Sequence, residues 1–317
     1  MFYAHASVGT LHVRPVLNMK SDKDIQNMRS ISEEAFEMVK DYKGSHSGEH
    51  GDGIVRSEFH EMMFGKKITN AFEEIKDTFD SKNLLNPGKI VRPFKSNDRS
   101  LMRYKSGYQT ENIDTHYDWS NWGQFSDAVE MCNNNGACRK LDSGVMCPSY
   151  RVTKEEKDLV RGRANTLRLA LSNQLPEGSF ASKEMYETME LCVSCKACQR
   201  ECPMSVDMAK MKSEFLSHYY KKFSMRIKDR VISDMPRLIW LLKIIAPIFN
   251  KIKNIPLIST IVEKFGFATA RTMPEVQNQN ALREIYDSQT VSDNKVILFA
   301  DTFNINFENE NLVYAIK

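Results

Sequence analysis

The sequence predicts an α+β fold over residues 1–95, followed by a mainly α-helical region over residues 125–220. Strand, helix, helix and strand patterns succeed one another in the first part, which fits an antiparallel sheet covered by helices. The second part contains all seven cysteines of the chain, between Cys132 and Cys202. Basic and acidic residues nearly balance, 44 against 41, so the charge gives no indication of nucleic-acid binding.

Two histidines flank a glycine at the start of the chain. Seven positions separate His5 from His12, with Gly9 between them. A straight strand would place them about 23 Å apart, and a helix would place them about 10 Å apart. A shared site therefore requires the chain to turn near residues 7–9, which glycine accommodates easily.

A glycine-rich loop over residues 44–53 contains the adjacent pair Glu49 and His50. Such a loop lets the backbone approach a flat ligand or an ion closely. Two histidines with one carboxylate form a familiar open metal site, and a histidine that titrates near neutral pH suits a general base. Each residue also has an ordinary interpretation as a surface or core side chain. We interpret His46 and His60 as ordinary loop and helix residues.

Two helices are predicted after the histidine pair. Ser21-x-x-Asp24 has the pattern of a helix start, and apolar residues then recur at helical spacing. The second helix runs over about residues 58–80, with an inward face that includes Ile68 and Phe79.

Polar and aromatic residues 96–124 are predicted as a linker between the two main regions. After the cysteine region, a helical extension is predicted over residues 221–290, and a last segment covers residues 291–317. Within that segment, residues 295–300, a lysine followed by five apolar residues, predict a buried strand.

The most apolar stretch covers residues 238–258, interrupted by Pro247 and by lysines. A membrane-spanning helix needs about 20 consecutive apolar residues. Two interpretations stay open, a helix packed within the protein or a basic amphipathic helix on a membrane surface. We expect a cytoplasmic protein, with peripheral attachment to the inner face of the membrane under the second interpretation.

The cysteines have the spacing of iron–sulfur ligands. A run of four reads C-x2-C-x2-C-x3-C-P, the bacterial ferredoxin pattern whose fourth cysteine binds the other cluster: Cys192, Cys195, Cys198 and Cys202. Three more form a degenerate upstream copy: Cys132, Cys138 and Cys147. A disulfide framework is disfavoured because a chain of 317 residues can bury a hydrophobic core without covalent cross-links. Zinc is disfavoured because its sites use two C-x2-C pairs.

If the last cysteine of each copy binds the cluster of the other copy, the seven thiols divide into a set of four and a set of three. The set of four for a [4Fe-4S] cluster is Cys147, Cys192, Cys195 and Cys198, and the set of three is Cys132, Cys138 and Cys202. The second set has three open outcomes: a [3Fe-4S] cluster, a [4Fe-4S] cluster with another fourth ligand, or no cluster. A rival partition uses the run at 192–202 for a single cluster and leaves the upstream cysteines structural.

Three segments resemble the C-terminal part of FAD-linked D-2-hydroxyacid dehydrogenases, the family of D-lactate dehydrogenase, glycolate oxidase and D-2-hydroxyglutarate dehydrogenase. They are A-H-A-S-V-G-T-L-H at 4–12, G-E-H-G-D-G at 48–53 and F-D-S-K-N-L-L-N-P-G-K-I at 79–90. The cysteine pattern followed by R-G-R-A-N at 161–165 resembles longer members that are fused to a ferredoxin-type iron–sulfur domain.

The resemblance implies that residues 1–95 form the substrate and metal part of an FAD-linked oxidase, with its FAD-binding domain or subunit missing. It also implies that residues 291–317 begin a truncated cysteine-rich domain. The sequence is therefore expected to be an internal fragment.

Roles carry over to matching positions. His5, His12 and Glu49 match divalent metal ligands of the zinc or manganese type, and His50 matches the base that takes the substrate hydroxyl proton. Asn86 matches a position near the flavin.

Arg14 stands where the family often has asparagine. An arginine there would pair with a second carboxylate and favour a diacid such as 2-hydroxyglutarate. The alternative is an ordinary surface cation.

The leading hypothesis is an oxidoreductase that oxidises a D-2-hydroxy acid of the 2-hydroxyglutarate, lactate or glycolate class with FAD. Electrons would pass through iron–sulfur clusters to a quinone or an electron-transfer protein. One alternative is a stand-alone iron–sulfur electron-transfer subunit without a substrate site. Another is a zinc-stapled interaction module.

Overall fold

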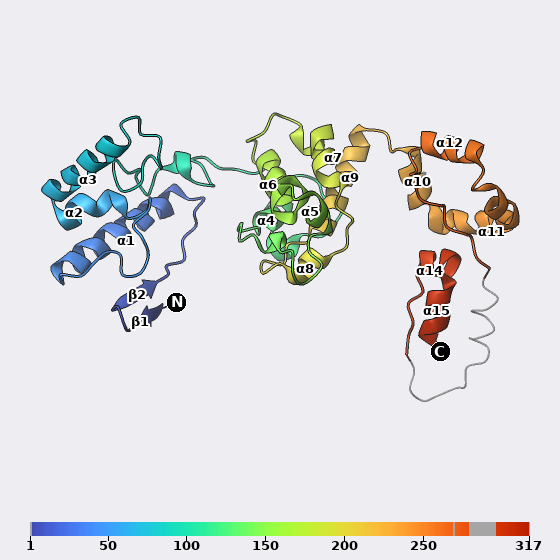
Figure 1. Ribbon diagram of the computed structural model, residues 1–317, viewed down its shortest axis with the longest axis horizontal. Coiled ribbons are helices and arrows are strands. Elements are labelled where there is room, and N and C mark those ends of the chain that lie inside the picture. Colours follow the sequence, from blue (N-terminus) through green and yellow to red (C-terminus); the bar gives the residue numbers. More distant parts are fainter. Residues whose placement is uncertain (1, 269, 279–295, 317) are drawn as a thin grey trace. The chain divides into compact units, whose positions relative to one another are not determined.

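The computed structural model describes residues 2–268, 270–278 and 296–316 (Figure 1). Contacts divide the chain into two compact units, Met1–Gly136 with Val160–Ser179, and Ala137–Leu159 with Phe180–Lys317. The predicted helical region over 125–220 thus contributes to both units. The ends of two predicted segments, residues 279–290 and 291–295, lie outside the described residues.

The first unit is mostly helical, with a two-stranded antiparallel sheet. Its elements are β1 (Phe2–His5), β2 (Thr10–Val13), α1 (Asp22–Asp41), α2 (His60–Phe64), α3 (Lys66–Phe79), α4 (Phe125–Glu130) and α6 (Val160–Leu171), with short 3-10 helices at Ser57–Phe59, Arg99–Leu101 and Ser120–Trp122. The predicted antiparallel pairing is present, but all residues of β1 are exposed. The sheet predicted to lie beneath helices is therefore a hairpin in the described chain, since each strand has four residues and one partner.

Helix α1 begins as the sequence predicts. The Ser21 hydroxyl accepts a hydrogen bond from the Asp24 amide at 3.4 Å, which satisfies one of the free donors at the helix start. The predicted second helix is divided at Gly65, whose φ of 81° ends α2 and precedes α3. The predicted inward face of α3 was wrong, because no residue of α3 is buried and Phe79 is 84% exposed.

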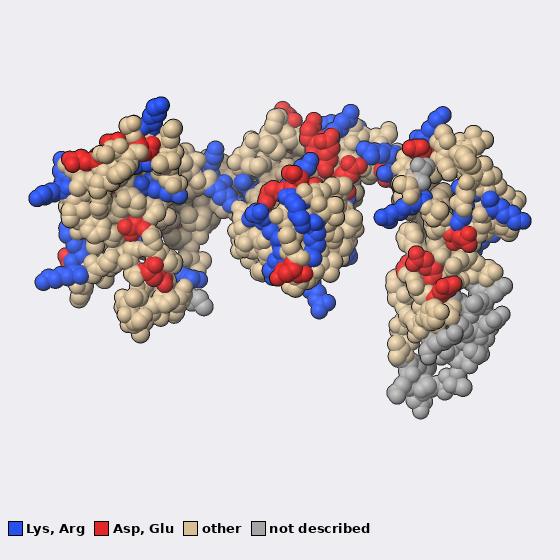
Figure 2. Space-filling view, in the orientation of Figure 1, with Lys and Arg blue, Asp and Glu red and all other residues tan. Residues whose placement is uncertain are grey.

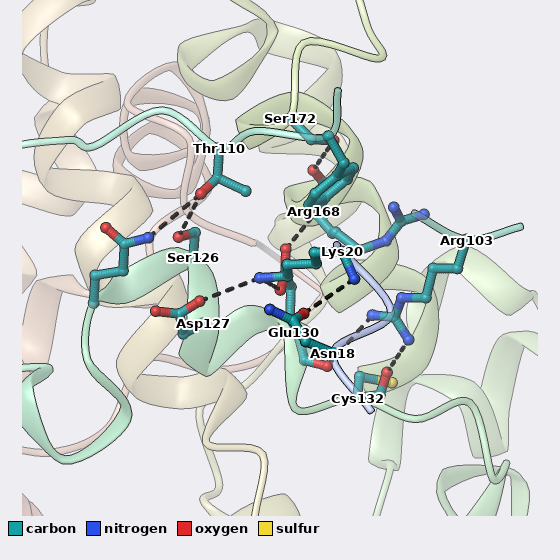
Figure 3. A network of polar contacts seen from close by, with 12 residues as sticks. Asn18, Lys20, Arg103, Thr110, Ser126, Asp127, Glu130, Cys132, Arg168 and Ser172 are labelled. Atoms are coloured by element: carbon teal, nitrogen blue, oxygen red, sulfur yellow. Dashed lines mark hydrogen bonds and ion pairs between the residues drawn. The ribbon is translucent and has the colours of Figure 1, made fainter. Parts of the chain in front are cut away.

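A polar network connects the segment before α1 to helix α4 (Figure 3). The Lys20 ammonium pairs with Glu130 and lies 3.4 Å from Asp127. Burial opposes the charge on Lys20, but the hydrogen bond and attraction from Glu130 raise its pKa above the ordinary value. The Tyr108 hydroxyl donates to Glu130 at 2.6 Å. Trp119 is buried as well, so the predicted linker over 96–124 packs as part of the first unit.

Within the described residues of the second unit, every regular element is helical. They are α5 (Pro148–Thr153), α7 (Lys183–Glu190), α8 (Ala197–Glu201), α9 (Met208–Lys222), α10 (Ile227–Ser233), α11 (Met235–Ile252), α12 (Pro256–Lys264), α14 (Thr302–Phe307) and α15 (Asn309–Ile316), with 3-10 turns at Ala137–Arg139 and Glu156–Asp158. The predicted buried strand at 295–300 was wrong over its described part. Residues 296–300 form no strand and Val296 is 94% exposed, because no described strand lies beside them to pair.

The apolar stretch at 238–258 forms most of α11, which contains Pro247 and has no buried residue. Its exposed side chains include Trp240, Ile244 and Ile248. Among the described residues, we find no helix whose length and apolarity would suffice to cross a bilayer. In the space-filling view, basic and acidic side chains intermingle over the visible surface, as the near-balanced composition predicts (Figure 2).

Candidate metal and cluster sites

The β1–β2 hairpin places the first two histidines on one face. Tyr3 pairs with His12 and His5 pairs with Thr10, and alternate residues of a strand share a face. His5 and His12 are therefore diagonal neighbours, with ring centroids 4.8 Å apart. The turn that a shared site requires lies at residues 6–9, where Gly9 has a φ of 64°.

The glycine-rich loop reaches this face through Gly48. A Cβ at Gly48 would overlap the Thr10 hydroxyl of β2, so the loop approaches the strand this closely only with glycine. The next residue, Glu49, then lies with Oε2 3.1 Å from His5 Nε2 and Oε1 2.9 Å from His12 Nε2.

The donor set at this position suits a divalent ion. One ligand atom each from His5, His12 and Glu49 lies within 4.8 Å of the others. His12 Nε2 is buried and makes no hydrogen bond of acceptable geometry, so its lone pair is available to a cation. Two imidazoles and one carboxylate with bonds of about 2.0–2.2 Å match a zinc or manganese type of site.

We expect Gly48→Ala to weaken binding of a divalent ion at His5, His12 and Glu49. The added methyl would push the loop from Thr10, and overpacking of this kind costs about 1–3 kcal/mol. That corresponds to roughly one to two orders of magnitude in the dissociation constant, measured by titration with Zn²⁺. Gly51→Ala is the matched control because its Cβ would meet no atom within 4 Å. Adding Thr10→Ala should restore affinity, and equal affinity in both single variants would contradict the prediction.

His50 and Arg14 lie beside the same group of side chains. His50 Nε2 is 3.3 Å from Glu49 Oε1, and its side chain is 64% exposed, so a substrate can reach it. Arg14 donates a hydrogen bond to the Tyr3 hydroxyl and lies 4.9 Å from the Tyr3 ring centroid. The Tyr3 ring in turn stacks on His12 at 4.2 Å, which ties Arg14 to the histidine face.

Asn86 lies in a separate, exposed turn, in a left-handed conformation with a φ of 48°. Asp80 fixes that turn by accepting hydrogen bonds from the amides of Leu84 and Leu85 at 2.9 and 2.8 Å. The hydrogen bond from Lys76, with these amides, lowers the pKa of Asp80 to about 2. The structure therefore brings His5, His12, Glu49 and His50 together and leaves Asn86 on its own turn.

All seven cysteines are free thiols. In the second unit, the Glu201 carboxylate of α8 accepts hydrogen bonds from the amides of Val145 and Met146 at 2.9 and 3.1 Å. The residue that follows, Cys147, is thereby held near α8, the helix that contains Cys198. Sequence reasoning missed Glu201, whose carboxylate binds the amides of the two residues directly before Cys147.

Burial raises the pKa of Cys198 to about 11, although the amides of Met208 and Ala209 at the start of α9 act in the opposite direction. The charge of Cys192 adds to the increase, so these two thiols are neighbours. The carbonyl of Cys192 is fixed by Lys212 at 2.6 Å. Between the thiols, Ser194 and Lys196 have left-handed backbones that curl the run, and Cys195 is exposed.

The three upstream cysteines are buried, Cys132 in the first unit and Cys138 and Cys147 in the second. Cys138 lies in the 3-10 turn Ala137–Arg139 of the second unit. In the first unit, Cys132 follows α4, and its carbonyl accepts a hydrogen bond from Arg103 at 2.6 Å.

The segment R-G-R-A-N also acts beside Cys132. Asn165 of this segment donates to Asn134 Oδ1 at 2.7 Å, and Arg161 reaches the Asn134 carbonyl at 3.4 Å. Asn134 Oδ1 lies 3.7 Å from Cys132 Sγ. The sequence shows the segment R-G-R-A-N, but it does not show that Arg161 and Asn165 hold Asn134 beside Cys132.

Two protein families match the chain in the order that these sites follow. Residues 1–90 match the FAD linked oxidases, C-terminal domain, and residues 128–206 match the 4Fe-4S dicluster domain. The two segments belong to these families. The resemblance predicted from the sequence is thus confirmed, and the histidine hairpin lies in the oxidase domain while all seven cysteines lie in the dicluster domain.

Curated relatives include D-2-hydroxyglutarate dehydrogenases of Pseudomonas putida and Escherichia coli. The first is 28% identical over 96% of this chain and 34% of its own length. The second is 29% identical over 83% of this chain and 29% of its own. A D-lactate dehydrogenase of Archaeoglobus fulgidus is 34% identical over 28% of this chain and 19% of its own. The chain spans about a third of the length of the first two. No solved structure matches.

Proposed function

We propose that this chain provides the substrate site and the electron exit of an FAD-dependent D-2-hydroxyacid dehydrogenase of the 2-hydroxyglutarate, lactate or glycolate class. The observation that carries the proposal is the convergence of His5, His12 and His50 on Glu49. The names of the relatives, D-2-hydroxyglutarate dehydrogenase and D-lactate dehydrogenase, support the substrate class.

In this proposal His5, His12 and Glu49 hold a divalent ion, zinc or manganese. When bound, the ion supplies a Lewis acid for the substrate, FAD supplies a hydride acceptor, and the clusters supply an exit for single electrons. His50 accepts the substrate hydroxyl proton, and Glu49 Oε1 lies 3.3 Å from its Nε2, beside the exposed ring.

Arg14 and Asn86 are assigned roles in recognition. Arg14, next to the histidine face through Tyr3, pairs with a second carboxylate and thus favours a diacid. Asn86, in its left-handed turn, would contact the flavin.

Cys147, Cys192, Cys195 and Cys198 are the proposed ligands of one [4Fe-4S] cluster, supported by the contact of Glu201 with residues 145–146. Cys132, Cys138 and Cys202 remain the proposed three-thiol set. The acceptor is a quinone or an electron-transfer protein, and the exposed apolar side chains of α11 support peripheral membrane attachment of a cytoplasmic enzyme.

Glu49→Ala tests the proposal in the FAD-containing enzyme purified without oxygen. We expect it to lose one equivalent of zinc or manganese and turnover of D-2-hydroxyglutarate, D-lactate and glycolate, because the carboxylate joins both histidines. Metal analysis and dye-coupled assays give the two readouts. Glu34→Ala, an exposed glutamate on α1, is the matched control. Unchanged metal and turnover would favour a stand-alone electron-transfer subunit instead.

A further inference from the structure

A second group of metal-ligating side chains lies in the first unit, apart from the set around Glu49. One ligand atom each from His46, Asp52 and His60 lies within 4.8 Å of the others. His46 and Asp52 come from the glycine-rich loop, and His60 is the first residue of α2. The proposed dehydrogenase chemistry uses none of them.

The surroundings of this group are dry and aromatic. The side chains of His46 and His60 are only 1% and 3% exposed, against 21% for Asp52. Phe36 and Phe64 have ring centroids 5.5 and 5.6 Å from that of His46, and the centroid of Phe64 is 5.5 Å from that of His60. Polar atoms buried in such a setting need partners, because each unpaired one costs about 1–3 kcal/mol.

Several polar atoms of the group lack those partners. Both ring nitrogens of His46, Nδ1 of His60 and Oδ1 of Asp52 are buried and make no hydrogen bond. The contact that is made joins His60 Nε2 to Asp52 Oδ2 at 2.8 Å. A paired histidine and aspartate thus account for two of the three side chains and leave His46 unexplained.

The spacing between His46 and Asp52 suits two ligands of one ion better than a hydrogen bond. His46 Nε2 lies 3.6 Å from Asp52 Oδ1, beyond hydrogen-bond range. Two ligands at about 2.0–2.1 Å from a tetrahedral zinc ion are about 3.3–3.4 Å apart. Asp52 is the partly exposed member, so a water has access to the fourth position.

We propose that His46, Asp52 and His60 bind Zn²⁺ as a structural ion. Such an ion would join the glycine-rich loop to the start of α2. Glu49 and His50 lie between His46 and Asp52 in the chain, so the ion would fix both ends of the segment that presents them to the hairpin. The inference stands beside the proposed function and does not require it.

Zinc stoichiometry tests the proposal on the full chain with its clusters, purified without oxygen. After treatment with EDTA, the protein is titrated with ZnCl₂, desalted and analysed for zinc. We expect two equivalents in the unaltered chain, one in Glu49→Ala, one in His60→Gln and in His46→Gln, and none in Glu49→Ala combined with His60→Gln. Zinc should also raise the unfolding temperature of the Glu49→Ala variant but not of the combined variant.

The variants separate the two proposals. If His46→Gln and His60→Gln bind as much zinc as the unaltered chain, the structural site is overturned, whatever Glu49→Ala does. If Glu49→Ala keeps both equivalents while the two histidine variants each drop to one, the proposed function fails and the structural site stands. Should the histidine variants fail to fold, zinc X-ray absorption of the Glu49→Ala variant decides. Two imidazoles with oxygen ligands support the site, and a sulfur shell or no bound zinc overturns it.

Discussion

The Cys147→Ser variant is expected to lose a complete [4Fe-4S] cluster, about four irons per chain. In the swapped arrangement, the cysteine that closes one copy of the run binds the cluster of the other copy. Glu201 holds residues 145–146 on α8, which brings Cys147 to the helix that contains Cys198. Iron and acid-labile sulfide analysis, with EPR of the reduced protein, measures the loss.

Cys202→Ser is the matched comparison because it replaces the cysteine that closes the run at 192–202, as Cys147→Ser replaces the cysteine that closes the upstream copy. In the proposed partition it spares the cluster bound by Cys192, Cys195 and Cys198. If Cys202→Ser destroys that cluster and Cys147→Ser leaves it intact, all four ligands come from the run at 192–202. A colourless preparation of the unaltered chain, free of sulfide, would refute both partitions.

His50→Ala is expected to lower turnover by about 10²–10⁴-fold, the usual contribution of a positioned general base. The metal should stay bound, because His5, His12 and Glu49 already form a set without His50. Steady-state turnover with a D-2-hydroxy acid and metal analysis of the same samples give the two readouts.

His116→Ala, an exposed histidine elsewhere in the first unit, should leave both turnover and metal unchanged. Retained turnover in His50→Ala would show that another group takes the proton. Loss of the ion with turnover would instead make His50 a ligand. Comparing the loss of turnover with the loss of metal therefore distinguishes the base from the three residues that we assign to the metal.

Much of the cluster region could be predicted from sequence because its chemistry is local. Short spacings between thiols, left-handed residues such as Ser194 and Lys196, and a proline after the last cysteine act over a few residues of backbone. The cap of α1 is local in the same sense, since Ser21 reaches an amide three residues on. Long-range burial was predicted less well, as Phe79 of α3 and Val296 show by their exposure.

The sequence by itself determined the donor types, the start of α1 and the need for a turn near Gly9. Only the tertiary structure decided which donors meet. Hairpin register put His5 and His12 on one face, and the missing side chain of Gly48 let Glu49 reach them from 37 positions beyond His12. The same folding buried His46 and His60 around Asp52, which their sequence contexts did not indicate. The physical reason is that spacing along a chain fixes local geometry, whereas contacts between distant residues depend on how complete side chains pack.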